Sequence, residues 1–211
     1  MNKNLYDFRI NYKKYRLELN NVPEEPIKLF DKWFHQLLKS NLLEPNAMVL
    51  STSINDKPSS RVVLLKKYDE KGFIFFTNYD SRKGKEIKKN NNACLLFYWM
   101  EFERQVRIEG KVVKISSKES DEYFKLRPLD SRYAAIASKQ SKILEDRILL
   151  EKEIQKLKKI YYDNPPRPFN WGGYRLIPKY FEFWQGRENR LHDRIVYKKI
   201  RKDWKIFRLY P

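Results

Sequence analysis

The sequence predicts an α+β fold in which an antiparallel β-barrel or curved sheet carries helices at its edges. Strand-like runs rich in β-branched and aromatic residues recur from Ala47 onward, turn-forming residues separate them, and helical segments interrupt them. Strands joined as hairpins with peripheral helices are typical of this class. The 211 residues are 41% hydrophobic, enough for a packed core. No internal repeat is present, so we expect one domain over residues 26–211 behind an N-terminal arm over residues 1–25.

Turn signals bound each predicted strand. The sequences NDKP and DEKG are hairpin-like, and MEFE lies at a further turn. The predicted strands are AMVLSTSI, SSRVVLLKKY, GFIFFTN, ACLLFYWM, RQVRIEGKVVKI, GGYRLIP, KYFEFWQG, DRIVYKKI and WKIFRLY.

Four segments have the pattern of helices. PEEPIKLFDKWFHQLLKS repeats apolar residues at helical spacing behind a proline, and His35 beside this apolar face is interpreted as a half-buried structural residue. SRKGKEIKKN begins at Ser81, which is placed to cap a helix. The segment from SSKESDEYFKLRP onward has capping-box spacing between Ser116 and Glu119. EDRILLEKEIQKLKKIYY is strongly periodic.

Several classes of protein are excluded or disfavoured by composition. The single cysteine, Cys94, excludes an internal disulfide and fits a reducing compartment. No run approaches the ~20 apolar residues of a membrane helix, and the start lacks the apolar stretch of a signal peptide. We therefore predict a cytoplasmic protein without membrane association. One cysteine and two distant histidines also argue against zinc, and no metal is predicted.

The formal net charge of +18 is open to two interpretations. It is typical of nucleic-acid-binding proteins, whose basic side chains release counterions from phosphates. However, lysine supplies 29 of the 45 basic residues and is spread along the whole chain, as a biased genome composition would also produce. We favour the compositional explanation and predict no nucleic-acid partner. The surface should still attract anions, so phosphorylated small molecules are natural ligands.

Two basic motifs are candidate anion sites. Arg61 lies within a strand of aliphatic residues, where a guanidinium is costly unless it is paired or faces a ligand. Arg61 and Lys66 have opposite parity, so either a bulge intervenes or they serve different surfaces. Arg82 and Lys83 stand in the first turn of a helix, where they oppose the helix dipole. A bound anion would remove this conflict, whereas a solvated helix start is an equally good interpretation.

Three further segments carry polar groups suited to a ligand. Gln105 enters a strand where its amide can donate to and accept from a heterocycle. DEYFKLRPLDSRYAAIASKQS gathers Tyr123, Arg127, Ser131, Gln140 and Ser141. The first three are spaced four residues apart, so their two hydroxyls and one guanidinium can converge on a second phosphate. FWQGRENRLHDR places His192 among three arginines, which indicates either a charged hairpin or a site for an anionic, planar ligand.

These motifs together resemble the pyridoxine/pyridoxamine 5′-phosphate oxidase family. The motifs that carry the resemblance occur in order along the chain: RVVLLK, FFTNYDSRKGKEI, FERQVRIEG, YFKLRPLDS, SKQS, WGGYRL and EFWQGRENRLHDR. The resemblance implies a split β-barrel homodimer with FMN sites at the subunit interface and a C-terminal segment, about residues 168–211, for dimerisation and substrate binding. It also implies oxidation of pyridoxamine 5′-phosphate or pyridoxine 5′-phosphate to pyridoxal 5′-phosphate, by hydride transfer from substrate C4′ to flavin N5, with O2 as acceptor.

The resemblance assigns a role to each candidate residue. The FMN phosphate would be held by Arg61, Arg82 and Lys83. The remaining FMN contacts would be Lys66, Phe76, Thr77, Gln105, Gln140, Ser141, Trp184 and Arg194. The substrate phosphate would be held by Lys66, Tyr123, Arg127 and Ser131, while Arg190 and His192 would lie over the pyridine ring as the catalytic residues.

Two departures from the family pattern leave alternatives open. The arm reads YKKYRLEL where an arginine-rich motif is usual, with Tyr12 in the place of the arginine and Tyr15 retained. Phe76 stands where tyrosine is common. The alternatives are another split-barrel flavoprotein of the flavin reductase type, and a basic nucleic-acid-binding module.

Overall fold

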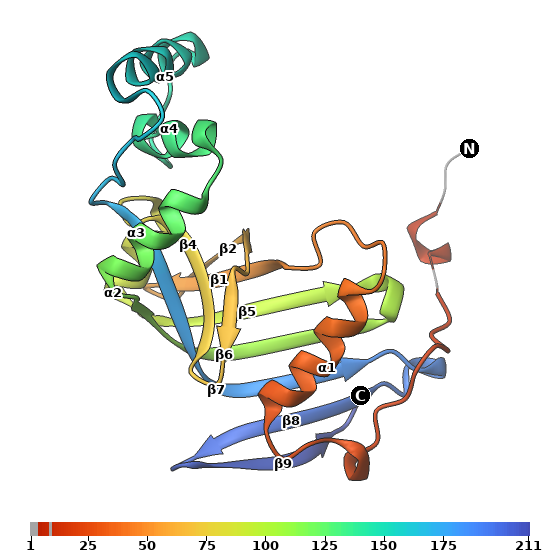
Figure 1. Cartoon of the computed structure of the whole chain (residues 1–211). Helices are drawn as coiled ribbons and strands as arrows, with labels where there is room; N and C mark the ends of the chain where they lie inside the picture. The colour runs from red at the N-terminus through yellow and green to blue at the C-terminus, as the bar shows by residue number, and fades with distance from the viewer. Residues whose placement is uncertain (1–3, 9) are drawn as a thin grey trace. The chain divides into compact units, whose positions relative to one another are not determined.

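The computed structural model describes residues 4–8 and 10–211, and within them nine strands form one sheet (Figure 1). Hydrogen bonds order seven strands as β2-β1-β5-β6-β7-β4-β3, while β8 pairs with β7 and β9. The pairs β3–β4, β4–β7, β7–β8 and β8–β9 are antiparallel, which confirms the predicted α+β class. The strands are β1 (Ala47–Ile54), β2 (Lys57–Leu64), β3 (Lys67–Asp69), β4 (Gly72–Asn78), β5 (Asn92–Trp99), β6 (Arg104–Lys114), β7 (Trp171–Gln185), β8 (Asp193–Ile200) and β9 (Asp203–Leu209).

Two of the helices begin at the side-chain caps that the sequence predicts. Ser81 accepts a hydrogen bond from the Gly84 N–H at 3.3 Å, and Ser116 forms the predicted capping box with Glu119. The helices are α1 (Pro26–Leu38), α2 (Arg82–Lys89), α3 (Ser117–Leu126), α4 (Leu129–Ala137) and α5 (Arg147–Tyr161). Short 3-10 segments cover Leu5–Asp7, Leu19–Asn21, Met100–Phe102 and Glu188–Arg190. No helix of the described residues is both long enough and apolar enough to cross a membrane.

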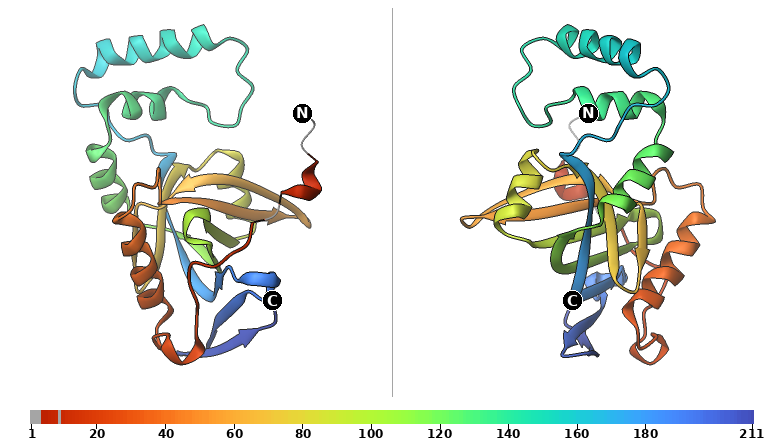
Figure 2. Two further views of the ribbon diagram at one scale, coloured as in Figure 1. Left: turned by 90° about the vertical axis from the view of Figure 1, so that its right-hand side faces the viewer. Right: turned by 60° about the vertical axis from the view of Figure 1, so that its left-hand side comes forward.

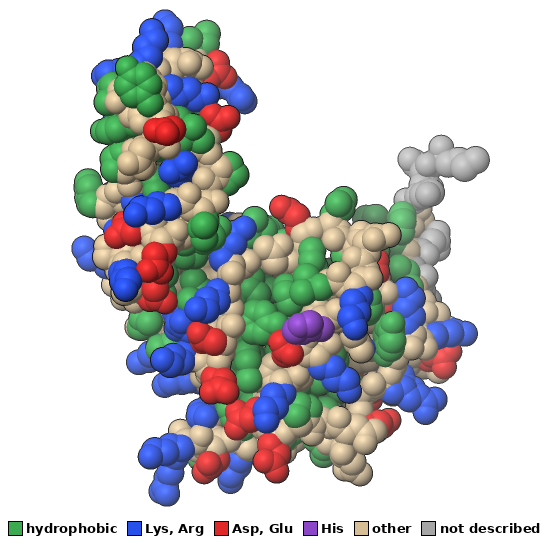
Figure 3. All heavy atoms as spheres, viewed as in Figure 1, with side chains coloured by type: hydrophobic (Ala, Val, Ile, Leu, Met, Phe, Trp, Pro, Cys, Tyr) green, Lys and Arg blue, Asp and Glu red, His purple; other side chains and the backbone are tan. Residues whose placement is uncertain are grey.

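The chain divides into two compact units. Unit 1 comprises Met1–Val49, Cys94–Glu109 and Pro178–Pro211, and unit 2 comprises Leu50–Ala93 and Gly110–Ile177. The single domain expected over residues 26–211 stays a prediction. On the face drawn in Figure 3, lysine and arginine side chains are scattered among acidic and apolar ones, as the compositional explanation of the charge predicts.

An aromatic core holds unit 1 together. Phe30 on α1 is fully buried and lies 5.2 Å from the ring of Phe97 on β5. Trp33, one turn later, meets Phe183 of β7 edge-on at 5.3 Å. The predicted apolar face of α1 is therefore the face that packs. His35 lies outside it and is exposed, because its ring bonds back to Asp31 on its own helix; the half-buried role expected for it is wrong.

Tight turns and helix pairs shape unit 2. Asn55 and Asp56 between β1 and β2 have φ of 47° and 60°, the left-handed pair that a two-residue hairpin requires. Helices α4 and α5 run side by side (Figures 1 and 2). The Lys158 ammonium lies 2.7 Å from the Asp130 carboxylate across this pair.

Two element boundaries differ from the prediction for reasons of backbone chemistry. The segments GGYRLIP and KYFEFWQG form one strand, β7, instead of two. Pro178 is tolerated because β4 pairs with β7 as far as Leu176 and the pairing of β7 with β8 begins at Tyr180, so Pro178 falls between these two pairings. Conversely, Pro128 ends the third predicted helix and separates α3 from α4.

The packing of the unit 1 core predicts that truncation of Phe30 lowers the stability of the protein strongly. Phe30→Ala removes a fully buried ring that contacts three other aromatic side chains, so we expect the free energy of unfolding to fall by ~3–5 kcal/mol. Urea denaturation followed by tryptophan fluorescence measures the loss. Leu43→Ala, at a side chain that is 94% exposed, is the control and should change stability by less than ~0.5 kcal/mol. Equal stability of the two variants would contradict this core.

Candidate functional site

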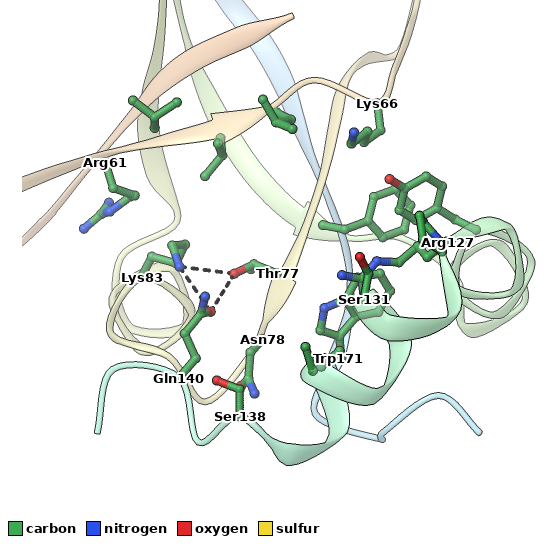
Figure 4. A pocket seen from close by; sticks show the side chains of 18 of the residues that line it. Arg61, Lys66, Thr77, Asn78, Lys83, Arg127, Ser131, Ser138, Gln140 and Trp171 are labelled. Carbon is green, nitrogen blue, oxygen red and sulfur yellow. Dashed lines mark hydrogen bonds between the residues drawn. The ribbon is translucent and has the colours of Figure 1, made fainter. Parts of the chain in front are cut away.

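A cavity of about 770 Å³ lies within unit 2 (Figure 4). Strands β2 and β4, helices α2, α3 and α4, and the segment that follows α4 contribute its walls. Nine of the predicted site residues line it: Arg61, Lys66, Phe76, Thr77, Lys83, Tyr123, Arg127, Ser131 and Gln140. The structure therefore brings together side chains that are far apart in the sequence, from Arg61 to Gln140.

The opposite parity of Arg61 and Lys66 is resolved by a break in the strand. β2 ends at Leu64 and β3 begins at Lys67, so Lys66 lies outside the regular pleat. Its backbone N–H donates to Ile74 O at 2.9 Å. Both side chains line the cavity as a result.

A buried carboxylate organises one end of the cavity. Glu86 on α2 accepts hydrogen bonds from Arg61 Nη2 at 2.8 Å, Thr52 Oγ1 at 2.6 Å and Arg82 Nε at 2.8 Å. Burial alone would raise the pKa of Glu86, but these bonds outweigh burial and hold the pKa below its ordinary value. Arg61 is 18% exposed and Arg82 is 69% exposed, so only Arg61 is fixed toward the cavity wall.

Lys83 is a second cation at this end, and its hydrogen bonds go to neutral oxygen atoms. Its ammonium lies 3.3 Å from Thr77 Oγ1 and 3.3 Å from Gln140 Oε1, and these two atoms are themselves 3.3 Å apart (Figure 4). Burial lowers the pKa of Lys83, and repulsion from Arg61 lowers it further, whereas Glu86 opposes the shift. The negative charge of an anion bound between Lys83 and Arg61 would oppose this lowering of the pKa.

The other end of the cavity combines aromatic rings with a second guanidinium. Tyr123 stacks on Phe76 with ring centroids 3.9 Å apart, and Arg127 lies 4.6 Å over the ring of Trp171. The Arg127 Nη1 atom is buried and, within the described residues, has no hydrogen-bond partner. Burial also lowers the pKa of Arg127, whereas Tyr123 opposes this shift. An unpartnered buried donor is costly, so this end is built for an acceptor that completes it.

A second cluster lies in unit 1 around His192. The His192 ring is 4.6 Å from Trp184, and Tyr12 of the N-terminal arm contacts both rings edge-on at 5.8 Å and 5.7 Å. The arm fits closely because residue 186 is glycine: a Cβ there would lie 2.7 Å from the Tyr12 ring and 3.1 Å from Glu103. Tyr15 is placed elsewhere, stacked on Phe102.

Carboxylates also hold the arginines of unit 1. Glu182 is buried and accepts from Arg194 Nε at 2.7 Å and from Arg107 Nη2 at 2.6 Å. Burial would raise the pKa of Glu182, but its bonds to both arginines lower it. Arg190 is exposed at the end of a 3-10 turn, with φ of 61°.

Seven predicted residues do not line the unit 2 cavity, and four of them lie in the C-terminal part of unit 1: Trp184, Arg190, His192 and Arg194. The other three are Arg82, Ser141 and Gln105. Arg82 points to Glu86, Ser141 is exposed with φ of 71°, and Gln105 lies in unit 1 on β6. Sequence reasoning also missed the carboxylates Glu86 and Glu182. The spacing of four between Arg82 and Glu86 was a usable signal, whereas Glu182 lies in an apolar strand without one.

Comparison with known proteins identifies the family. The profile described as pyridoxamine 5′-phosphate oxidase matches residues 34–161, and the one described as the pyridoxine 5′-phosphate oxidase C-terminal dimerisation region matches residues 171–211. The chain belongs to the pyridoxamine 5′-phosphate oxidase family. Its relatives include the pyridoxine/pyridoxamine 5′-phosphate oxidases of Burkholderia lata and Paraburkholderia xenovorans, each 51% identical and aligned over 98% of this chain and 99% of the relative.

Solved structures confirm the fold within this family. The PhzG protein of Burkholderia lata, solved in complex with tetrahydrophenazine-1-carboxylic acid, is 34% identical with a TM-score of 0.90, covering 95% of this chain and 100% of that one. A pyridoxamine 5′-phosphate oxidase-related, FMN-binding protein of Nostoc punctiforme has a TM-score of 0.68 at 15% identity, covering 90% and 98%. The second likeness concerns the fold alone.

The Glu86 cluster predicts a specific dependence of stability on pH. The folded-state pKa of Glu86 is depressed, so its contribution is present above the unfolded pKa of ~4.3 and is lost as pH falls through the folded value. We expect Glu86→Gln to lower the free energy of unfolding by ~1–3 kcal/mol at pH 7. The difference from the unmodified protein should shrink as pH falls from ~4 through the depressed folded-state pKa of Glu86, because the glutamate then becomes uncharged like the glutamine.

Urea unfolding across this pH range measures the effect. Glu70→Gln, in the exposed turn between β3 and β4, is the matched control and should leave stability unchanged. A Glu86→Gln difference that persists undiminished at low pH would contradict the charge pairing.

Proposed function

We propose that the protein is an FMN-dependent oxidase of vitamin B6 phosphates. Pyridoxamine 5′-phosphate, O2 and water give pyridoxal 5′-phosphate, ammonia and hydrogen peroxide; pyridoxine 5′-phosphate and O2 give pyridoxal 5′-phosphate and hydrogen peroxide. The observation that carries this proposal is the cavity with a cationic group at each end, in a chain that belongs to the pyridoxamine 5′-phosphate oxidase family.

The residues of the cavity fit an FMN phosphate. Arg61 and Lys83 present two cations at one end, and burial and the neighbouring Arg61 both lower the pKa of Lys83. A bound phosphate would supply negative charge between them. Thr77 and Gln140 add a hydroxyl and an amide to the same end. We assign these four residues to FMN, with Arg82 as the partner that completes the coordination of Glu86. Lys66, Phe76, Gln105, Ser141, Trp184 and Arg194 are the further FMN contacts of the proposal.

The opposite end of the cavity fits the substrate phosphate. The unpartnered Nη1 of Arg127 needs an anionic acceptor, and Ser131 and Lys66 line the same cavity. Tyr123 is held by its stacking on Phe76, which fixes the direction of its hydroxyl. A phosphate satisfies such a set better than an uncharged group, because charge-assisted hydrogen bonds are about twice as strong as neutral ones.

In this proposal the chain's own residues bind and orient, and the cofactor carries the redox chemistry. When bound, FMN supplies a two-electron acceptor for the hydride that leaves substrate C4′ and passes both electrons to O2. The phosphate contacts of Arg127 and Ser131 fix the position of the substrate, and such positioning contributes strongly to the rate. Arg190 lays a planar cation against the pyridine ring, and His192 bonds its polar edge. Arg194, held by Glu182, stabilises the negative charge that develops on the reduced flavin.

The proposal includes a homodimer. The C-terminal segment matches a profile described as a dimerisation region. Large apolar side chains of unit 2 are exposed in the single chain, including Leu126, Ile143 and Phe169. A partner subunit would cover such side chains. The cytoplasmic location stays a prediction.

A different substrate is the main competing function, because PhzG was solved with a phenazine-type carboxylic acid. Its identity of 34% is lower than the 51% of the relatives named as pyridoxine/pyridoxamine 5′-phosphate oxidases. The unpartnered N–H of a guanidinium can donate to a carboxylate or to a phosphate, so a direct comparison of the two kinds of substrate decides between them.

The visible spectrum tests the function. We expect the purified protein to be yellow, and anaerobic addition of pyridoxamine 5′-phosphate to bleach the flavin band. Pyridoxamine without its phosphate, and a tricyclic carboxylic acid of the phenazine class, are the comparison compounds. Bleaching by the tricyclic acid alone would replace the proposed substrate. A protein that cannot be loaded with FMN would defeat the proposal.

The FMN assignment predicts a contrast between two lysines on α2. Lys83 lines the cavity and Lys85, two residues later, is exposed. We expect Lys83→Met to raise the dissociation constant for FMN by about 10- to 100-fold, since a charge-assisted contact contributes ~1.5–3 kcal/mol. Lys85→Met is the matched control and should bind FMN normally. Quenching of FMN fluorescence measures both, and equal affinities would place the flavin phosphate elsewhere.

A further inference from the structure

One backbone hydrogen bond determines which nitrogen of His192 carries the proton. The Arg187 N–H donates to His192 Nδ1 at 3.1 Å. A backbone amide nitrogen can only donate, so Nδ1 must be the acceptor with a free lone pair. The single proton of the neutral ring is then on Nε2, on the side of the ring that points away from Arg187.

The surroundings keep the ring in this orientation. Trp184 and Tyr12 contact the ring at 4.6 Å and 5.8 Å. The Arg187 side chain is anchored in turn, because its Nη1 lies 3.1 Å from Asp193 Oδ2. Asp193 is buried and also accepts from Arg208 Nη1 at 2.7 Å and from the Leu17 N–H at 3.1 Å. Within the described residues this carboxylate accepts from three donors, and His192 is not one of them.

The local charges favour the neutral ring. Burial lowers the pKa of His192, and the positive charge of Arg190 lowers it further, whereas Asp193 opposes the shift. Protonation of Nδ1 would also turn the bond from Arg187 into a contact between two N–H donors. The groups that face the ring from the 3-10 turn are Arg187 and Arg190. Strand β8 contributes Asp193, which is paired with Arg187, and the arm contributes the Tyr12 ring.

We propose that His192 acts as a neutral hydrogen-bond donor through Nε2–H and is not the group that takes up a proton from the substrate. The role toward substrate rests on the function proposed above, while the tautomer does not. Such a donor selects ligands with an acceptor at this edge, such as the ionised ring hydroxyl of a 3-hydroxypyridine. It rejects analogues that lack the acceptor, because the Nε2–H would be left unsatisfied.

The tautomer can be read directly because the chain contains two histidines. His35→Gln removes the other one, which lies exposed on α1 and bonds to Asp31. In protein labelled with 15N-histidine, with FMN loaded, we expect the remaining imidazole to show a protonated Nε2 and an unprotonated Nδ1 at pH 7. A protonated Nδ1, either as the other tautomer or as imidazolium, would overturn the proposal. The spectrum needs no turnover, so it stands even if B6 phosphates prove not to be substrates.

Two isosteric variants test the donor role. The glutamine amide of His192→Gln reaches the position of Nε2, whereas the asparagine amide of His192→Asn reaches that of Nδ1. We expect kcat/KM for pyridoxamine 5′-phosphate to fall less than about tenfold for glutamine and on the order of a hundredfold for asparagine, as loss of a hydrogen bond to a charged acceptor implies. FMN binding, measured for both variants, checks that they fold.

The pH profile of kcat/KM separates a donor from a base. We expect the unmodified enzyme and His192→Gln to share the same acidic limb, since a group that only donates Nε2–H does not have to be free of a further proton in order to act. An acidic limb that disappears in His192→Gln would identify His192 as a base and overturn the proposal. So would equal losses for the glutamine and asparagine variants.

Discussion

Pairing between arginines and buried carboxylates is the constraint on which the candidate site depends. Glu86 fixes Arg61, Glu182 fixes Arg194, and Asp193 fixes Arg187 beside His192. A buried carboxylate without a partner is strongly unfavourable, so each pair locks two chain segments into one arrangement. The guanidinium groups are consequently oriented before any ligand arrives, which lowers the entropic cost of binding an anion.

The regular elements could be predicted from the sequence because their signals are local. Runs of β-branched and aromatic residues between turn signals predicted β1 and β4, and side-chain caps predicted the starts of α2 and α3. The continuity of β7 through Pro178 could not be predicted, because it depends on where two other strands stop pairing. The exposure of His35 was missed because a position at the margin of an apolar face is decided by tertiary packing.

The candidate site was predictable as a set of residue types but not as a geometry. The motifs predicted nine of the residues that line the cavity, and Arg61 and Lys66 share it because β2 ends before Lys66. The carboxylates that hold the arginines give little signal in one sequence, since glutamate is common and only its burial distinguishes Glu182. The acceptor role of His192 Nδ1 lay beyond prediction as well, because its partner is a backbone group.

The glycine at position 186 couples the evolution of the N-terminal arm to that of the rest of unit 1. Any larger residue there would meet the Tyr12 ring at 2.7 Å, while the Gly186 N–H still donates to Glu103 O at 2.7 Å. The backbone at position 186 cannot move away from Tyr12 without breaking this hydrogen bond, so the arm would have to change instead. A lineage that replaced this glycine would have to shrink or relocate the aromatic side chain at position 12 at the same time, and the two positions should therefore have changed together.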